Sequence, residues 1–261
     1  MQLRLLVNFN IVVYLKLLAS NYFKDLINIM IKNPTELFTD GWTAYEKVLK
    51  HNYLFHEEIY SDIKKYIGSR NLKNSLDMLE AGCGDASQTI KLFHDFDLQY
   101  YHGIDLSSFA LEIAKKNLEP FKIKANLECG DILEGMSHVS SQFDIVFTSF
   151  AIHHLQLKEK QKFFNLAIEK LKDNGILIYV DVMKEFEKQD RTTYINSYLQ
   201  YAKQNWNELD KKEMEAVNEH VSHYDFPESL ETNVLLAKNS GFRDYTKLGH
   251  HTWHQAIIFY K

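Results

Sequence analysis

The chain has 261 residues, enough for one large domain or for one domain with a cap. Hydrophobic residues make up 45% and charged residues 25%, as in ordinary soluble globular proteins, and the net charge of −5 argues against a general attraction to nucleic acid. The two cysteines, Cys83 and Cys129, cannot form a disulfide framework, so we expect two reduced thiols in a cytoplasmic protein.

Residues 1–33 are an apolar-rich extension. The apolar run is interrupted by four polar residues, Arg4, Asn8, Asn10 and Lys16. It therefore falls short of the roughly 20 mostly apolar residues of a membrane span, and its centre is too polar for a good signal peptide. A peripheral amphipathic helix, or an upstream extension before a start at Met30, fits these residues better.

Residues 34–70 form a predicted helical cap. Pro34 suits the first helical position, apolar side chains recur at helical spacing, and Gly68 is expected to stop the helix. The aromatic residues of this segment, including Trp42 and Tyr45, either pack in a core or line a substrate cavity.

A short strand, a glycine turn and a helix follow one another next. Residues 76–79 read as a buried strand, and the acidic Glu80 stands where that strand should end. Gly82 and Gly84 follow, and a helical pattern begins at residue 88. Glycines let the backbone turn sharply and let a ligand approach closely, so this order predicts a nucleotide-type binding loop.

Strands and helices alternate through residues 71–183, which predicts a parallel sheet covered on both faces. We expect a helix to about residue 93, strands at 100–104, 123–128, 143–149 and 176–182, helices at 107–118 and 159–171, and a turn at 173–175.

The remainder of the chain breaks this rhythm. Residues 184–223 read as a helical insertion that could serve as a substrate lid. Residues 224–261 complete the core with a helix at 228–239, which Gly241 follows, and with strands at 245–249 and 253–260. No helix separates those two strands, so they must form an antiparallel hairpin.

The glycine loop resembles the first motif of class I S-adenosylmethionine-dependent methyltransferases, acid-x-Gly-x-Gly-x-Gly. The stretch from Glu80 to Ala86 matches it except that Ala86 replaces the last Gly. A dinucleotide-binding loop would instead want a third Gly at position 87, which is Ser87. A parallel sheet finished by a hairpin also resembles this family. The expected fold is therefore α/β, with a doubly wound, mostly parallel seven-stranded sheet, a C-terminal antiparallel hairpin, an N-terminal helical cap and a helical insertion.

This resemblance implies S-adenosylmethionine as the cofactor. Asp105, 21 residues past Gly84, would accept hydrogen bonds from both ribose hydroxyls, although it could instead cap the following helix. Glu80 would act on the methionine ammonium through water or the loop backbone. Asp131 would take the adenine amino group and Ile132 would pack on the ring. The other expected cofactor contacts are Ala81, Gly82, Cys83, Leu106, Ser149 and Phe150.

The loop after the fourth strand faces the methyl donor in this family. His153 or His154 could orient or deprotonate the acceptor there, or could have a purely structural role. Further substrate candidates are Trp42, Tyr45, Tyr198, His223 and His254. The histidines at 220–223 and 250–254 raise the question of a metal, but no cysteine or dense carboxylate cluster accompanies them, so none is expected.

The favoured function is methyl transfer to a small molecule, with no nucleic-acid partner and no stable membrane span. The alternatives are methylation of a protein or tRNA, a non-catalytic S-adenosylmethionine-binding protein of the same fold, and an NAD-dependent oxidoreductase. The acceptor atom and the oligomeric state stay open.

Overall fold

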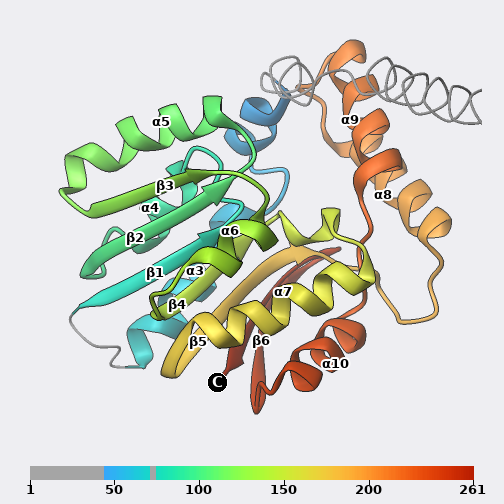
Figure 1. Ribbon diagram of the computed structural model, residues 1–261. Coiled ribbons are helices and arrows are strands. Elements are labelled where there is room, and N and C mark those ends of the chain that lie inside the picture. The colour runs from blue at the N-terminus through green and yellow to red at the C-terminus, as the bar shows by residue number, and fades with distance from the viewer. Residues whose placement is uncertain (1–43, 71–74) are drawn as a thin grey trace, which may run out of the picture. The chain divides into compact units, whose positions relative to one another are not determined.

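A seven-stranded sheet in the order β3-β2-β1-β4-β5-β7-β6 lies at the centre of the computed structural model, which describes residues 44–70 and 75–261 (Figure 1). The strands are β1 (Leu76–Ala81), β2 (Leu98–Asp105), β3 (Lys124–Cys129), β4 (Phe143–Ser149), β5 (Leu171–Val182), β6 (Asp244–His251) and β7 (His254–Tyr260). Strands β1 to β5 pair in parallel, whereas β7 runs antiparallel between β5 and β6. The predicted fold class, including the C-terminal hairpin, is confirmed.

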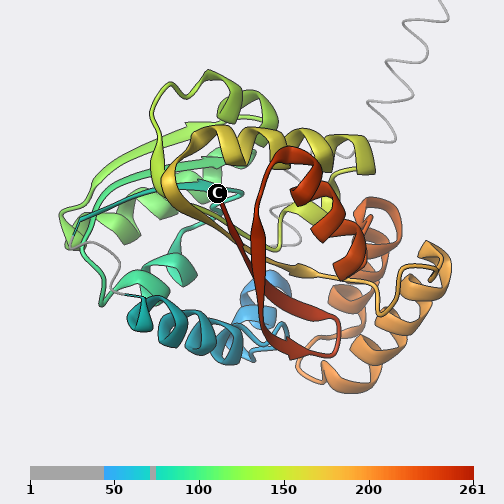
Figure 2. The same cartoon turned by 90° about the horizontal axis from the view of Figure 1, so that it is seen from below.

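Two groups of helices cover the two faces of this sheet (Figure 2). One face carries α3 (His56–Ser69), α4 (Ser87–Phe93) and α5 (Ser108–Leu118), and the other carries α6 (Ile132–His138), α7 (Leu157–Lys170) and α10 (Leu230–Ser240). Side chains of each strand alternate between the faces, so that Ile145 packs on the first and Val146 on the second. Both faces are buried, which explains the continuous apolar runs of β4 and β5.

A third apolar cluster joins the helical insertion to the cap. The insertion forms α8 (Arg191–Asn205) and α9 (Lys211–Tyr224), as predicted. Its aromatic residues Tyr194, Tyr198 and Trp206 pack with Ala44 and Val48 of the helical segment 44–50. Segments far apart in the sequence therefore share one core beyond the carboxyl end of β5.

Three local predictions are wrong. Residues 173–175, predicted as a turn, are part of β5. The pairing of β5 with β4 is irregular at this point, and Asn174 has a φ angle of 64°. Gly68 does not stop α3, which ends at Ser69. The cap helix is interrupted at 51–55, where Asn52 and Phe55 have positive φ angles. The sequence analysis also missed α6.

The extension 1–33, the first part of the predicted cap and Trp42 lie outside the described residues. Within the described part of the chain, no helix is long and apolar enough to cross a membrane.

Candidate active site

The glycine loop connects β1 to α4 in the conformation that the sequence predicts. Gly82 and Gly84 have φ angles of 75° and 50°, in the region that side chains rarely adopt. A Cβ atom on Gly82 would lie 2.4 Å from the Cβ of Ala151, so the loop packs directly on the segment after β4. A Cβ atom on Gly84 would meet no atom of residues 44–70 or 75–261 within 4 Å, so these residues leave that side of the loop open to a ligand.

Asp105, at the end of β2, is joined to this loop. Its Oδ2 accepts a hydrogen bond from the backbone N–H of Gly84 at 2.8 Å, and its Oδ1 accepts one from Ser107 N–H at 2.9 Å. The N-cap of α5 is Ser107, whose hydroxyl oxygen accepts from Ala110 N–H, so capping does not account for Asp105. Burial raises the pKa of Asp105, and the two backbone N–H groups oppose that shift.

Glu80 is buried beneath the loop. Its two carboxyl oxygens accept hydrogen bonds from the Thr89 hydroxyl at 2.7 Å and the Tyr101 hydroxyl at 2.6 Å. Burial raises the pKa of Glu80 to about 8, although both hydroxyls oppose the shift. A positive group that binds next to a carboxyl with such a pKa favours its ionised form. Cys83 is buried close to Gly103 of β2, and Ala81 ends β1 with its carbonyl oxygen accepting from Thr148.

The carboxyl ends of β2 and β3 present the residues expected at the adenine. Asp131 is the N-cap of α6, because its Oδ1 accepts from the N–H groups of Leu133 and Glu134. Ile132 is only 9% exposed and packs mainly in the core. Leu106, in contrast, is 63% exposed, and so offers an apolar surface to a flat ring.

Aromatic side chains gather at the carboxyl end of β4. The backbone of Phe150 has a φ of 53°, which is strained for a bulky residue and is typical of functional sites. Its ring meets His56 edge-on at 4.8 Å, and the Tyr60 hydroxyl donates to Ser149 Oγ at 2.8 Å. Tyr45 is 39% exposed, yet desolvation of its hydroxyl, followed by the charges of Asp85, Asp105 and Glu80, raises its pKa.

His153 and His154 lie in a short 3-10 turn after β4 and meet two buried carboxylates. His153 Nδ1–H donates to Asp181 Oδ1 at 2.5 Å, and its Nε2 lies 3.7 Å from Asp225 Oδ1. His154 Nδ1 lies 3.4 Å from the same Asp225 oxygen. Burial lowers the pKa of His153, but Asp181 and Asp225 outweigh burial and raise it.

The other predicted substrate residues lie in different places. Tyr198 and His254 meet in the third apolar cluster, with Tyr198 Oη 3.3 Å from His254 Nε2, and burial lowers the pKa of His254 to about 4. His223 is exposed, and its Nδ1 pairs with the Glu219 carbonyl oxygen inside α9. One turn earlier, His220 Nε2 lies 3.8 Å from Asp225 Oδ1.

Sequence reasoning missed Tyr60, Tyr101, Asp181 and Asp225. An acid at the end of an apolar strand was a usable signal for Asp181. The approach of Asp225 depends on how α9 docks, so no local pattern could have revealed it.

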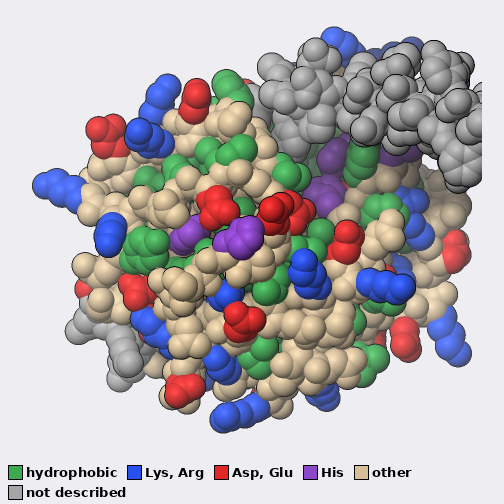
Figure 3. Space-filling model, in the orientation of Figure 1, with side chains coloured by type: hydrophobic (Ala, Val, Ile, Leu, Met, Phe, Trp, Pro, Cys, Tyr) green, Lys and Arg blue, Asp and Glu red, His purple; other side chains and the backbone are tan. Residues whose placement is uncertain are grey.

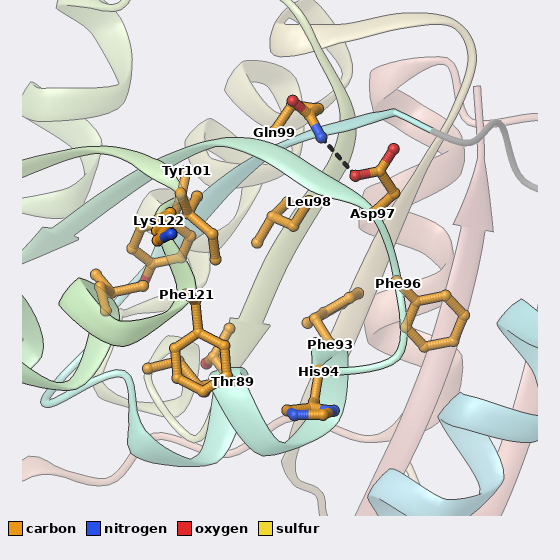
Figure 4. Close-up of a pocket in the computed structure, with 13 residues that line it drawn as sticks. Thr89, Phe93, His94, Phe96, Asp97, Leu98, Gln99, Tyr101, Phe121 and Lys122 are labelled. Atoms are coloured by element: carbon orange, nitrogen blue, oxygen red, sulfur yellow. Dashed lines mark hydrogen bonds between the residues drawn. The ribbon is translucent and has the colours of Figure 1, made fainter.

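A cavity of about 200 Å³ lies between α4, β2 and the residues after α5 (Figure 4). Phe96, Leu98 and Gln99 line it at the amino end of β2. Ligands of open α/β sheets bind beyond the carboxyl ends of the strands, so we do not assign the cofactor to this cavity. Thr89 and Tyr101, which hold Glu80, also line it.

These features define the class: a Rossmann-like fold whose glycine loop and strand-end acids suit an adenosyl cofactor. Residues 72–239 match a family model described as a methyltransferase domain. The chain belongs to this family and is a class I S-adenosylmethionine-dependent methyltransferase, an enzyme that uses S-adenosylmethionine.

Named relatives are distant. The chain is 22% identical over 214 residues to a carboxy-S-adenosyl-L-methionine synthase of Sulfurimonas denitrificans, covering 81% of this chain and 88% of the relative. It is 26% identical over 170 residues to the phosphoethanolamine N-methyltransferase of Plasmodium falciparum, covering 60% and 62%. A cyclopropane synthase of Mycobacterium tuberculosis shares the fold with a TM-score of 0.54 at 12% identity, over 77% of this chain and 82% of that one.

Proposed function

We propose that the enzyme transfers the methyl group of S-adenosylmethionine to a small molecule bound beyond β4 and β5. The observation that carries this proposal is the third apolar cluster, in which aromatic side chains of α8 pack with apolar side chains of α9 and of the segment 44–50 beyond this end of the sheet. In this proposal Glu80, Asp105, Leu106, Asp131 and the glycine loop hold the cofactor, and His154 faces the acceptor. His153, which Asp181 and Asp225 hold, positions its neighbour.

Charge and similarity support a small acceptor. Acidic and basic side chains are interspersed on the face that Figure 3 shows, whereas a nucleic-acid groove concentrates basic ones. The relatives named above include a phosphoethanolamine N-methyltransferase, which by its name acts on a small molecule.

Methyl transfer asks for positioning more than for acid–base chemistry, because the sulfonium is already electrophilic. A base is needed only when the acceptor atom starts protonated. An assay with labelled S-adenosylmethionine and a metabolite extract, followed by mass spectrometry, tests the proposal. Label in a small product and formation of S-adenosylhomocysteine support it, whereas label only in protein or tRNA contradicts it.

The Asp105→Ala variant should bind S-adenosylmethionine more weakly by about 1.5–3 kcal/mol, since a charged hydrogen-bond acceptor is lost. Calorimetry measures this loss, and circular dichroism confirms folding. Asp95→Ala is the matched control, because Asp95 is exposed before β2 and pairs, among the residues the structure describes, with its surface neighbours Lys64 and His94. Unchanged affinity in a folded Asp105→Ala chain would exclude the ribose role.

A further inference from the structure

A buried histidine lies between two buried acids where the loop after β4 meets the carboxyl end of α9. The Nδ1–H of His153 donates to Asp181 Oδ1 at 2.5 Å, and its Nε2 lies 3.7 Å from Asp225 Oδ1. The side chains of His153, Asp181 and Asp225 are 9%, 0% and 5% exposed, so water and salt screen their charges little. We call these three residues the His153 ion cluster.

The direction of the two ring nitrogens indicates that His153 is protonated. A carboxylate oxygen can only accept a hydrogen bond, and each ring nitrogen faces one. A neutral imidazole that donates from Nδ1 would turn the lone pair of Nε2 toward Asp225 Oδ1, whereas an imidazolium carries a hydrogen on both nitrogens. Among the residues that the structure describes, this oxygen has no hydrogen-bond partner, and a buried carboxylate is costly unless a cation faces it. The geometry therefore favours the imidazolium.

Helix α9 depends on this ion cluster because few of its side chains reach the core. Of the 14 residues of α9, Val221 alone is buried, with Met214 and Val217 partly buried in the third apolar cluster. Four side chains of α8, in contrast, are buried. Asp225 directly follows α9, so its ion pair with His153 attaches the carboxyl end of this helix to the loop after β4.

We propose that the protonated imidazole of His153 attaches the carboxyl end of α9 to the loop after β4, and that loss of the proton releases this helix end. His153 is then a positioning residue for methyl transfer. The end of α9 presents the Tyr224 carbonyl oxygen, to which His154 Nδ1–H donates at 3.1 Å, so release of α9 also frees the His154 ring. The effect on turnover rests on the proposed role of His154, whereas the release of α9 does not.

Two neutral contacts limit how far the helix end can move. Phe226 N–H donates to the His153 carbonyl oxygen at 2.7 Å and holds the chain just beyond Asp225. The guanidinium of Arg191 donates to the carbonyl oxygens of Ser222 and Asp225, and it stays charged at every pH of interest. Loss of the proton therefore loosens the last turn of α9 without unfolding the insertion.

Other titratable side chains face His153 from four directions. Burial, the largest influence, lowers the pKa of His153, and Lys160 of α7 lowers it further, but the two acids of the cluster outweigh them and raise it. The ring of His154 lies 3.9 Å from that of His153, centroid to centroid. Desolvation lowers the pKa of His220 in α9 and of His254 in β7 to about 4, so both are neutral above pH 6.

The sign of the pH dependence follows from the two states of the helix. With α9 attached, His153 faces Asp225 and holds its proton more tightly than after release. Attachment is therefore favoured at low pH, weakens as the pH rises above the pKa of the released state, and is weakest above the raised pKa of the attached state. Each unit of difference between these two pKa values changes the equilibrium about tenfold.

Hydrogen–deuterium exchange of the full 261-residue chain tests the proposal without cofactor or acceptor. After correction for the intrinsic pH dependence of exchange, amides of the last turn of α9 should lose about tenfold in protection between pH 6 and pH 8.5. Amides of α5, which packs on the sheet away from the insertion, should keep theirs and serve as an internal reference. Carbon NMR of the His153 ring should give the same midpoint.

Asp225→Asn should remove the pH dependence, because an amide of the same shape carries no charge for His153 to face. The matched control is His223→Gln, which removes an exposed histidine of the same helix whose Nδ1 pairs with the Glu219 carbonyl oxygen. This control should keep the wild-type pH dependence.

Three results would overturn the proposal. The first is α9 protection that does not change with pH in the wild type. The second is a pH dependence that survives in Asp225→Asn, which would assign it to Lys160, whose pKa burial lowers to about 8. The third is a His153 ring that is neutral at pH 6. If Asp225→Asn does not fold, the NMR titration of wild-type His153 decides. A failed acceptor search would leave all of these measurements unaffected.

Discussion

Replacing His154 with Ala is expected to lower kcat while the Kd for S-adenosylmethionine stays unchanged: the loss is about 10²-fold or more if His154 acts as a base, and smaller if it only orients the acceptor. The reason is the position of His154. It follows the segment that packs on the glycine loop, but its own contacts are with Tyr224 and Asp225 at the end of α9. Its loss should therefore affect the acceptor side of the site and not the cofactor loop. Single-turnover kinetics with an identified acceptor and calorimetry with the cofactor measure the two quantities separately.

His154→Gln separates the two roles that remain open for this residue. A glutamine amide can hydrogen-bond an acceptor but cannot take its proton. Recovery of part of the rate therefore indicates orientation, and no recovery indicates a base. His153→Ala should be measured beside it, and His223→Ala is the matched control on the surface of α9. Wild-type turnover in both His153→Ala and His154→Ala would move the acceptor site elsewhere.

The grouping of the candidate cofactor residues at one edge of the sheet could be predicted because these residues follow local rules. Gly82, Gly84 and Asp105 stand at the ends of apolar strands, and parallel strands bring their carboxyl ends to one edge of the sheet. The short α6 escaped prediction because its seven residues include Gly135, a poor helix former, and because its apolar face is set by packing on α7.

The acceptor side depends on contacts between distant segments. Asp181 reaches His153 from β5, the strand that pairs with β4, whereas Asp225 reaches it only because α9 docks beside the loop after β4. From the sequence, His223 and His254 are the histidine candidates for the substrate site beside His153 and His154. The structure instead brings His220 to Asp225 and buries His254 against Tyr198. Helical spacing alone does not say which face of α9 turns inward.

Glu80 is expected to make the ligand-free enzyme less stable as the pH rises. The pKa of Glu80 is about 8 in the folded chain, against an ordinary value of 4.5. Between these values the folded state binds more protons than the unfolded state, so the free energy of unfolding falls as pH increases. At about 1.4 kcal/mol per pKa unit, the loss is of the order of 3–5 kcal/mol and is complete above pH 8. Denaturant unfolding from pH 5 to pH 8.5 measures it.

Glu80→Gln should remove this loss, because an amide fills the same space between Thr89 and Tyr101 without titrating. The variant should be more stable than wild type at pH 8.5 and should differ little at pH 5. Asp85→Asn is the control, because Asp85 is a half-buried acid in the same loop. Parallel stability curves for wild type and Glu80→Gln would show that Glu80 ionises normally.

The same carboxyl links stability to cofactor binding. The sulfonium and ammonium groups of S-adenosylmethionine favour the ionised form of a nearby acid, so binding at pH 7 should release most of one proton from Glu80. Calorimetry in two buffers of different ionisation enthalpy counts that proton. Glu80→Gln should release none by this route and should bind the cofactor more weakly, because the buried negative charge is absent. Equal proton release by both chains would place the responding group elsewhere in the site.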